Sequence, residues 1–179
     1  MISFPVSKKE KAVVLLIASK WRRPSLDKLM IGISDPYQWL TPTLILALCL
    51  IYIDWRSGIQ ALLLGAFSAA MADGINARYI KPNVDRIRPG QQFDEVESIG
   101  NMNKGHHSFP SNHAANTLAF TLALSLFFPG MLWFLLPFTL LVGYSRIYCG
   151  AHFPLDVIGG WVHGSAWVML FYLTIFSRI

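Results

Sequence analysis

One stretch decides the fold: residues 113–147 read HAANTLAFTLALSLFFPGMLWFLLPFTLLVGYSRI. It contains two long apolar segments, at roughly 113–128 and 131–147, and only Pro129 and Gly130 separate them. Apolar segments that approach the ~20 residues needed to cross a bilayer core are typical of membrane-spanning helices. Helices joined by so short a connection run antiparallel as neighbours. The stretch therefore predicts a helical hairpin inside a membrane.

The same pattern continues on both sides of this hairpin. Further apolar segments lie at roughly 38–53, 58–77 and 156–176, and the first two are joined by the short connection 54–57. The chain of 179 residues is 54% hydrophobic and only 14% charged, whereas a soluble domain carries about 25% charged residues. We expect an all-α protein: a polytopic membrane helix bundle with five to six transmembrane helices.

Positive charge is concentrated at the N-terminus. Residues 1–28 contain seven Lys and Arg residues against Glu10 and Asp27, and the remaining residues are neutral overall. Residues 6–20 predict an amphipathic helix whose apolar part is too short to cross a bilayer. We expect it to lie in the membrane interface with its lysines toward anionic headgroups; the alternative is a first span completed by a bend. The chain is accordingly divided into this N-terminal region, 1–28, and a membrane domain, 29–179.

Three polar segments lie at the ends of the apolar ones. They read KPNVDRIRP at 81–89, PSNH at 110–113 and SRIYCGAHFPLD at 145–156. The polar segment at 81–89 follows the apolar segment at 58–77, and the one at 110–113 opens the apolar segment at 113–128. The polar segment at 145–156 joins the apolar segments at 131–147 and 156–176. With short hairpins between the helices, all three face the same side of the membrane. Polar groups are costly near a membrane unless they bind something, so these segments predict one functional site.

The cations in these segments are suited to a phosphate group. Charge on a transferred phosphoryl group is stabilised mainly by positioned cations and amide donors. Ser111 would open a helix, where its hydroxyl and the free amides of the first turn can hold a phosphate oxygen. Asn112 is expected at a position with unusual backbone angles, which a short polar side chain tolerates. The candidate phosphate-binding residues are Lys81, Arg88, Ser111, Asn112 and Arg146.

Two histidines and one carboxylate are the candidate catalytic groups. Three residues separate His152 from Asp156, a spacing at which the carboxylate can cap a helix and still contact the imidazole. A carboxylate on one ring nitrogen fixes the tautomer and leaves the other nitrogen as a nucleophile. His113 would then protonate the leaving oxygen. No His, Cys, Asp or Glu cluster has metal-ligand spacing, so we expect no metal and no cofactor.

At these residues the sequence resembles the type-2 phosphatidic acid phosphatase family, whose pattern is K-x6-R-P, P-S-G-H and S-R-x5-H-x3-D. The first and third elements match in full, and the second has Asn112 in place of glycine. The resemblance implies that His152 is the nucleophile that becomes phosphorylated, with Asp156 as its partner and His113 as the acid. It also implies phosphate binding by Lys81, Arg88, Ser111 and Arg146.

The resemblance predicts an integral membrane phosphatase that hydrolyses a lipid phosphate monoester or pyrophosphate through a phosphohistidine intermediate. Small members of the family include lipid A 1-phosphatases, undecaprenyl diphosphate phosphatases and phosphatidylglycerophosphate phosphatases, and the basic N-terminal region favours the densely anionic lipid A. A transporter or membrane scaffold would also be hydrophobic, but that function would not explain the presence of two histidines and an aspartate. The expected partners are the lipid phosphate and membrane lipids, with no nucleic acid; no oligomeric state is indicated.

Two further interpretations concern location and the remaining polar residues. The N-terminal cations argue for a cytoplasmic active site, whereas the family resemblance argues for the periplasmic face. We expect a multi-pass protein of the bacterial inner membrane with a periplasmic site. Asp73 and Asn76, late in an apolar segment, are interpreted as supporting or helix-packing residues. Arg86 is a cation that the family pattern does not require.

Overall fold

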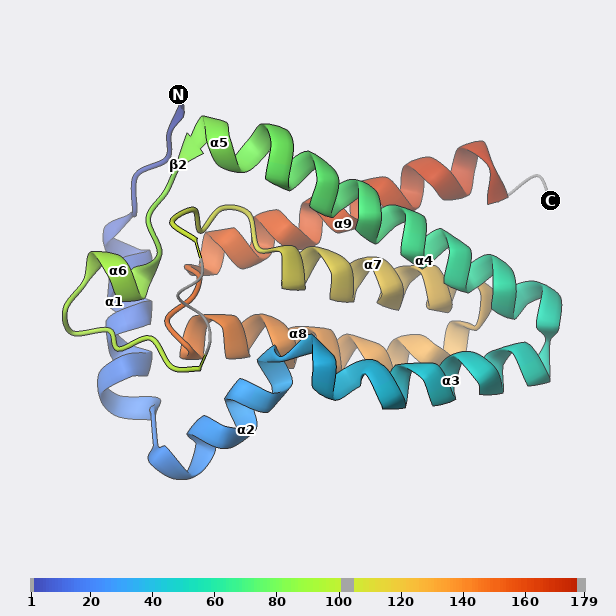
Figure 1. Cartoon of the computed structure of the whole chain (residues 1–179), viewed down its shortest axis with the longest axis horizontal. Helices are drawn as coiled ribbons and strands as arrows, with labels where there is room; N and C mark the ends of the chain where they lie inside the picture. Colours follow the sequence, from blue (N-terminus) through green and yellow to red (C-terminus); the bar gives the residue numbers. More distant parts are fainter. Residues whose placement is uncertain (1, 101–104, 177–179) are drawn as a thin grey trace.

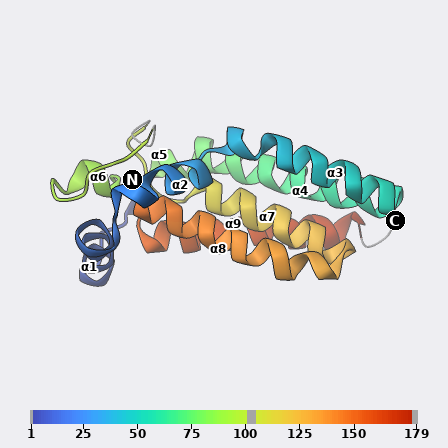
Figure 2. The same ribbon diagram turned by 90° about the horizontal axis from the view of Figure 1, so that it is seen from below.

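The computed structural model describes residues 2–100 and 105–176. Its long helices lie side by side as a bundle (Figure 1, Figure 2). They are α3 (Leu40–Ile53), α4 (Trp55–Ile75), α7 (Asn112–Phe127), α8 (Leu132–Tyr148) and α9 (Pro154–Thr174). This arrangement confirms the predicted all-α membrane architecture, and the predicted segments agree with these helices to within a few residues at most ends.

Shorter elements complete the described chain. Near the N-terminus these are β1 (Ile2–Ser3), α1 (Lys8–Leu16), a π-helical turn (Ile17–Trp21), α2 (Pro24–Ser34) and a 3₁₀ turn (Pro36–Trp39). Further along are a second π-helical turn (Asn76–Ile80), α5 (Lys81–Asn83), β2 (Val84–Asp85), α6 (Pro89–Gln92) and a 3₁₀ turn (Pro129–Met131). Residues 101–104 lie outside the described residues.

Within the described residues, four helical segments are long and apolar enough to cross a membrane by length and composition: Pro36–Ile53, Trp55–Asn83, Pro129–Tyr148 and Pro154–Thr174. The fifth bundle helix, α7, has 16 residues, or about 24 Å of helix at 1.5 Å per residue. It packs against α4, α8 and α9. Small side chains let neighbouring helices approach closely, and the buried residues of α7 include Ala114, Ala115, Ala119 and Ala123.

Helix α4 continues further than the sequence pattern predicts. The apolar segment was expected at roughly 58–77, but the helical segment runs from Trp55 to Asn83. A π-helical turn at Asn76–Ile80 carries the helix through polar residues into α5. Lys81 therefore stands at the end of a continuous helical segment.

The close contact between α7 and α9 depends on two glycines. A Cβ atom on Gly160 would overlap the carbonyl oxygen of Ser111, and one on Gly164 would overlap the carbonyl oxygen of Ala115. The Ser111 amide donates a hydrogen bond to the Asp156 carbonyl at 2.9 Å. This contact fixes the first turn of α7 against the first turn of α9.

Helix α1 lies across one end of the bundle rather than along it (Figure 1). The adjoining β1 pairs in parallel with β2, with Ile2 opposite Val84. One face of α1 is buried, with Glu10 at 5% exposure and Val14 at 1%. Its exposed residues include Lys8, Lys9 and Lys11. The interfacial position of residues 6–20 and the boundary at residue 28 stay predictions.

Candidate active site

The structure brings the three polar segments together at the end of the bundle covered by α1 and α2. A cavity of about 430 Å³ is lined there by six of the eight predicted site residues, namely Lys81, Arg88, Asn112, His113, Arg146 and His152. The opposite wall comes from the end of α2 and the following turn, including Ser34, Asp35 and Tyr37. The other two predicted residues, Ser111 and Asp156, are fully buried.

Turns between the helices hold the cations in place. Gly150, between α8 and α9, has a φ of +71°, a left-handed conformation that favours glycine. Its carbonyl accepts a hydrogen bond from the Gly90 amide at 3.0 Å, which ties the first polar segment to the third. Arg88 Nη1 donates to the Ala151 carbonyl at 3.2 Å and Nε to the Gly105 carbonyl at 3.1 Å. Arg146, in the last turn of α8, donates to the Ser34 carbonyl at 3.4 Å.

Ser111 and Asn112 form the start of α7. Ser111 is the N-cap, and its Oγ accepts a hydrogen bond from the Ala114 amide at 3.4 Å. Asn112 is the first residue of the helix, and its Oδ1 accepts from Asn76 Nδ2 at 3.0 Å. No described non-glycine residue has a positive φ. The expectation of unusual backbone angles at Asn112 was therefore wrong: a helix-start position does not require glycine.

His152 is held by a backbone carbonyl as well as by Asp156. Its Nδ1 lies 2.7 Å from the Ser108 carbonyl oxygen and 3.7 Å from Asp156 Oδ2. Since a carbonyl can only accept, this contact assigns the ring proton to Nδ1 and leaves Nε2 unprotonated. The sequence predicted that Asp156 alone would hold the Nδ1 side of the ring. In the structure Asp156 Oδ2 instead accepts a hydrogen bond from the Phe153 amide at 2.7 Å. Asp156 thus caps α9, as expected, and supports the imidazole from a longer distance.

Burial sets the charge state of His152. The residue lies in the connection between α8 and α9 and is 2% exposed. Loss of solvation lowers the pKa of His152 to about 4, against an opposing effect of Asp156 and with a further lowering by Arg146 and Arg88. The imidazole is therefore neutral near pH 7, which is the state that a nucleophile requires.

A buried charge network behind His152 was not predicted from the sequence. Arg86 is 2% exposed and donates from Nη1 to Asp156 Oδ1 and from Nη2 to Glu10 Oε1, the latter at 2.7 Å. Its guanidinium lies between the rings of Phe4 and Phe153, at 4.4 and 4.7 Å. Helix α1 thereby contributes a buried carboxyl to the network that holds Asp156. An acidic residue in an otherwise basic helix was the available signal for Glu10.

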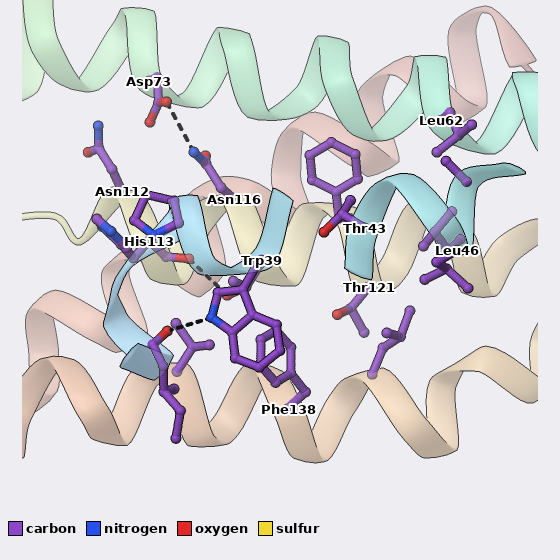
Figure 3. Close-up of a pocket in the computed structure, with 18 of the residues that line it drawn as sticks. Trp39, Thr43, Leu46, Leu62, Asp73, Asn112, His113, Asn116, Thr121 and Phe138 are labelled. Carbon is purple, nitrogen blue, oxygen red and sulfur yellow. Dashed lines mark hydrogen bonds between the residues drawn. The ribbon is translucent and has the colours of Figure 1, made fainter. Parts of the chain in front are cut away.

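A second, apolar cavity of about 580 Å³ adjoins the first and shares His113 and Asn112 with it. It lies between α3, α4, α7 and α8, and Figure 3 shows the side chains that line it. Most are apolar, among them Trp39, Leu46, Leu62 and Phe138. His113 therefore lies where a cationic cavity meets an apolar one within the helix bundle.

The described residues include no group of three or more His, Cys, Asp or Glu that could hold a metal ion. The arrangement offers cations for a phosphate, a neutral imidazole for attack and a second imidazole beside an apolar space. Such a site is suited to transferring the phosphate of an amphipathic molecule.

Comparison with known proteins places this arrangement in a family. A sequence model of the PAP2 superfamily matches residues 59–179. The undecaprenyl-diphosphatase of Sulfolobus acidocaldarius is 33% identical over 148 residues, covering 80% of this chain and 68% of that protein. The lipid A 1-phosphatase of Rhizobium johnstonii is 32% identical over 131 residues, covering 72% of this chain but 51% of that protein.

Two solved structures share the fold. The Aquifex aeolicus LpxE structure matches with a TM-score of 0.71 and 22% identity over 94% of this chain and 98% of that one. The Bacillus subtilis PAP2-type phosphatidylglycerolphosphate phosphatase matches with a TM-score of 0.67 and 22% identity over 96% of this chain and 86% of that one. Together with the family match, the bundle and the converging motifs, these results show that the chain belongs to the PAP2 superfamily and is a membrane lipid phosphatase.

Proposed function

We propose that the protein removes a phosphate from lipid A, at its 1-position, through a covalent phosphohistidine at His152. The observation that carries this proposal is the position of His113 at the junction of the cationic and apolar cavities. A lipid could place its phosphate among the cations while its hydrocarbon part occupies the apolar space. Undecaprenyl diphosphate and phosphatidylglycerophosphate are the alternative substrates, as the names of the relatives indicate.

The first half of the proposed reaction forms the phosphoenzyme. His152 Nε2 attacks phosphorus, a P–N bond forms, and the bond between phosphorus and the lipid oxygen breaks. His113 gives its proton to that leaving oxygen, so the lipid departs as an alcohol. Lys81, Arg88 and Arg146, with the first-turn amides of α7, stabilise charge on the equatorial oxygens.

The second half releases the phosphate. His113, now neutral, takes a proton from a water molecule that attacks phosphorus, and the P–N bond breaks. Inorganic phosphate leaves, and His152 returns to its neutral state. The Ser108 carbonyl and Asp156 hold the imidazole orientation through both halves.

The preference for lipid A depends on the N-terminal cations. Exposed lysines on and after α1 lie at the end of the bundle that holds the cavity. Each cation near an anionic surface contributes on the order of 1 kcal/mol of attraction. Arg22 is excluded from this set because it pairs with Asp27 and Glu97, at 3.5 and 3.0 Å.

The experiment measures vanadate-sensitive phosphate release from a panel of purified lipids: lipid A, undecaprenyl diphosphate and phosphatidylglycerophosphate. Lipid A should give the highest kcat/KM in anionic bilayers. Replacing Lys8, Lys9 and Lys20 with glutamine should raise KM for lipid A, while an Arg56→Gln control, at the other end of the bundle, should not. Release from none of the lipids would refute the proposed reaction, and a higher kcat/KM for another lipid would refute the proposed substrate.

We also propose an inner-membrane location with the active site facing the periplasm. The candidate spans support membrane insertion, and the relatives include bacterial enzymes of lipid A and phosphatidylglycerophosphate. A cysteine placed at exposed Tyr37, beside the cavity, should react with a membrane-impermeant maleimide in intact spheroplasts. Labelling only after lysis would place the site on the cytoplasmic side.

A further inference from the structure

A polar pair interrupts the apolar wall of the second cavity. Asn116 lies one helical turn beyond His113 on α7, and its Nδ2 donates to Asp73 Oδ2 of α4 at 3.0 Å. Figure 3 shows the two side chains meeting across the cavity wall, close to Asn112 and His113. Both Asp73 and Asn116 line the cavity.

One side-chain oxygen of each residue lacks a donor. Asp73 Oδ1 and Asn116 Oδ1 are buried and accept no hydrogen bond from any residue that the structure describes. A buried acceptor without a donor is unfavourable, and such exceptions in native proteins call for an explanation. By contrast, the Thr121 hydroxyl, deeper in the same cavity, is paired with the Thr139 hydroxyl at 2.7 Å. The unsatisfied acceptors are thus next to the reaction centre.

Their position corresponds to the leaving group of the proposed reaction. His113 protonates the oxygen that departs with the lipid, and the apolar cavity extends from His113 along α4 as far as Leu62. Asp73 and Leu62 are separated by roughly 16 Å of helix at about 1.5 Å per residue. A lipid whose hydrocarbon part fills this space would place the atoms nearest its phosphate beside Asp73 and Asn116.

We propose that Asp73 and Asn116 form an acceptor subsite for a hydroxyl or amide N–H that the lipid carries within a few bonds of its phosphate. This inference rests on the proposed function and deepens it, because it assigns the substrate to lipids with a sugar or glycerol backbone rather than plain polyprenyl or alkyl phosphates. A site built to hydrogen-bond a substrate hydroxyl discriminates against the analogue that lacks it, because its polar groups are then left unpaired.

Asp73 also lies within electrostatic reach of Lys81 in the phosphate cavity. A carboxyl that acted only through Lys81 would influence every phosphate substrate to the same extent. The two roles therefore differ in selectivity rather than in overall rate.

A matched pair of probes tests the subsite: 1-O-oleyl-glycerol 3-phosphate and its 2-deoxy analogue, which lacks only the free hydroxyl. We expect the wild-type protein to favour the hydroxyl-bearing lipid by at least about tenfold in kcat/KM. Asp73→Leu and Asn116→Ala should each reduce this ratio toward one. The two variants act on different helices, so the test stands if one of them fails to fold.

The control is Ser68→Ala. Ser68 also lies on α4, and its buried hydroxyl forms no hydrogen bond with the described residues. Ser68 lines neither cavity. Its replacement should leave the ratio at the wild-type value. Equal losses on both probes in Asp73→Leu and Asn116→Ala, or a wild-type ratio near one, would overturn the subsite while leaving the phosphatase reaction standing. Hydrolysis of no lipid phosphate at all would instead refute the proposed function.

Discussion

The state of one imidazole determines whether the proposed attack can occur. Because burial lowers the pKa of His152 to about 4, the folded protein should resist protonating this ring as the pH falls through 6.5, its ordinary pKa. The Ser108 contact at 2.7 Å places the proton on Nδ1. His152 should therefore present an unprotonated Nε2 across the neutral range.

The first prediction is that His152 titrates near pH 4 in the folded protein. In ¹⁵N-histidine-labelled protein, the His152 resonances, assigned with His152→Ala, should show a protonated Nδ1 and an unprotonated Nε2 at pH 7. Proton binding at this histidine also affects stability. As the pH falls from about 6.5 to about 4, the unfolded chain binds the proton while the folded chain does not, so the free energy of unfolding decreases. A midpoint near 6.5 would contradict the burial argument.

The second prediction concerns the pair behind the nucleophile. Glu10→Ala would remove one of the two carboxyl partners of buried Arg86, and a buried donor left without its acceptor costs about 1–3 kcal/mol. Thermal unfolding should show a loss of this order together with reduced turnover, since Arg86 also contacts Asp156. Glu97→Ala is the matched control: its pair with Arg22 is 3.0 Å long but the Glu97 side chain is 77% exposed, so the loss should be about 0–1 kcal/mol. Equal losses in both variants would argue against the network.

Residue spacing predicted much of the site but not its supporting contacts. The ordered motifs identified Lys81, Arg88, His113, Arg146 and His152, because short hairpins bring segment ends together whatever the details of packing. The partners of these residues could not be found in this way. Ser108 contacts His152 through its backbone, which leaves no signature in the identity of the side chain.

At the level of helices, the length of the apolar segments predicted where the helices lie, but the onset of polar residues did not predict where α4 ends. The sequence located the bundle helices because each must bury its backbone polar groups in a run of hydrogen bonds. The sequence pattern predicted that α4 would end near residue 77, where polar residues begin. The π-helical turn at Asn76–Ile80 continues the helix, and the docking of α1 onto the end of the bundle depends on tertiary contacts of Glu10 and Val14.

The third prediction tests the close contact between α7 and α9. Gly160→Ala would place a methyl group against the Ser111 carbonyl and 3.0 Å from Ala114 Cβ. Because a backbone atom cannot move aside as a flexible side chain can, the helices must separate, at a cost of about 1–3 kcal/mol.

The shift would also displace the helix start that carries His113, so both thermal stability and turnover should fall. Gly74→Ala supplies the comparison, because a Cβ atom there meets nothing within 4 Å and alanine favours a helix by up to about 1 kcal/mol. A Gly160→Ala protein as stable and active as Gly74→Ala would show that the contact between α7 and α9 is not tightly packed.

For the whole molecule, the bundle offers the proposed substrate two environments. Three cations face a polar cavity at one end of the helices, and apolar side chains line the adjoining cavity between α3, α4, α7 and α8. In the proposed reaction, these cations would supply the charge stabilisation that a metal ion provides in many other phosphatases.

The fourth prediction is that catalysis requires no added metal. Phosphate release should persist in EDTA and in exhaustively chelated buffer, with kcat/KM within about twofold of the untreated protein. An Arg146→Ala variant should lose activity in the same buffers, because it removes a cation that lines the cavity. Loss of wild-type activity on chelation, followed by recovery with Mg²⁺ or Zn²⁺, would refute metal independence.

Chemical trapping identifies the residue that becomes phosphorylated. Rapid quenching of the protein with a ³²P-labelled lipid phosphate should trap a protein-bound label that is lost in acid and survives in base, as expected for phosphohistidine. The label should be absent from His152→Ala and present in His163→Ala, whose imidazole lies in α9 and accepts a hydrogen bond from Trp167 Nε1 at 2.7 Å. Label retained in folded His152→Ala protein would contradict the assignment of His152 as the nucleophile.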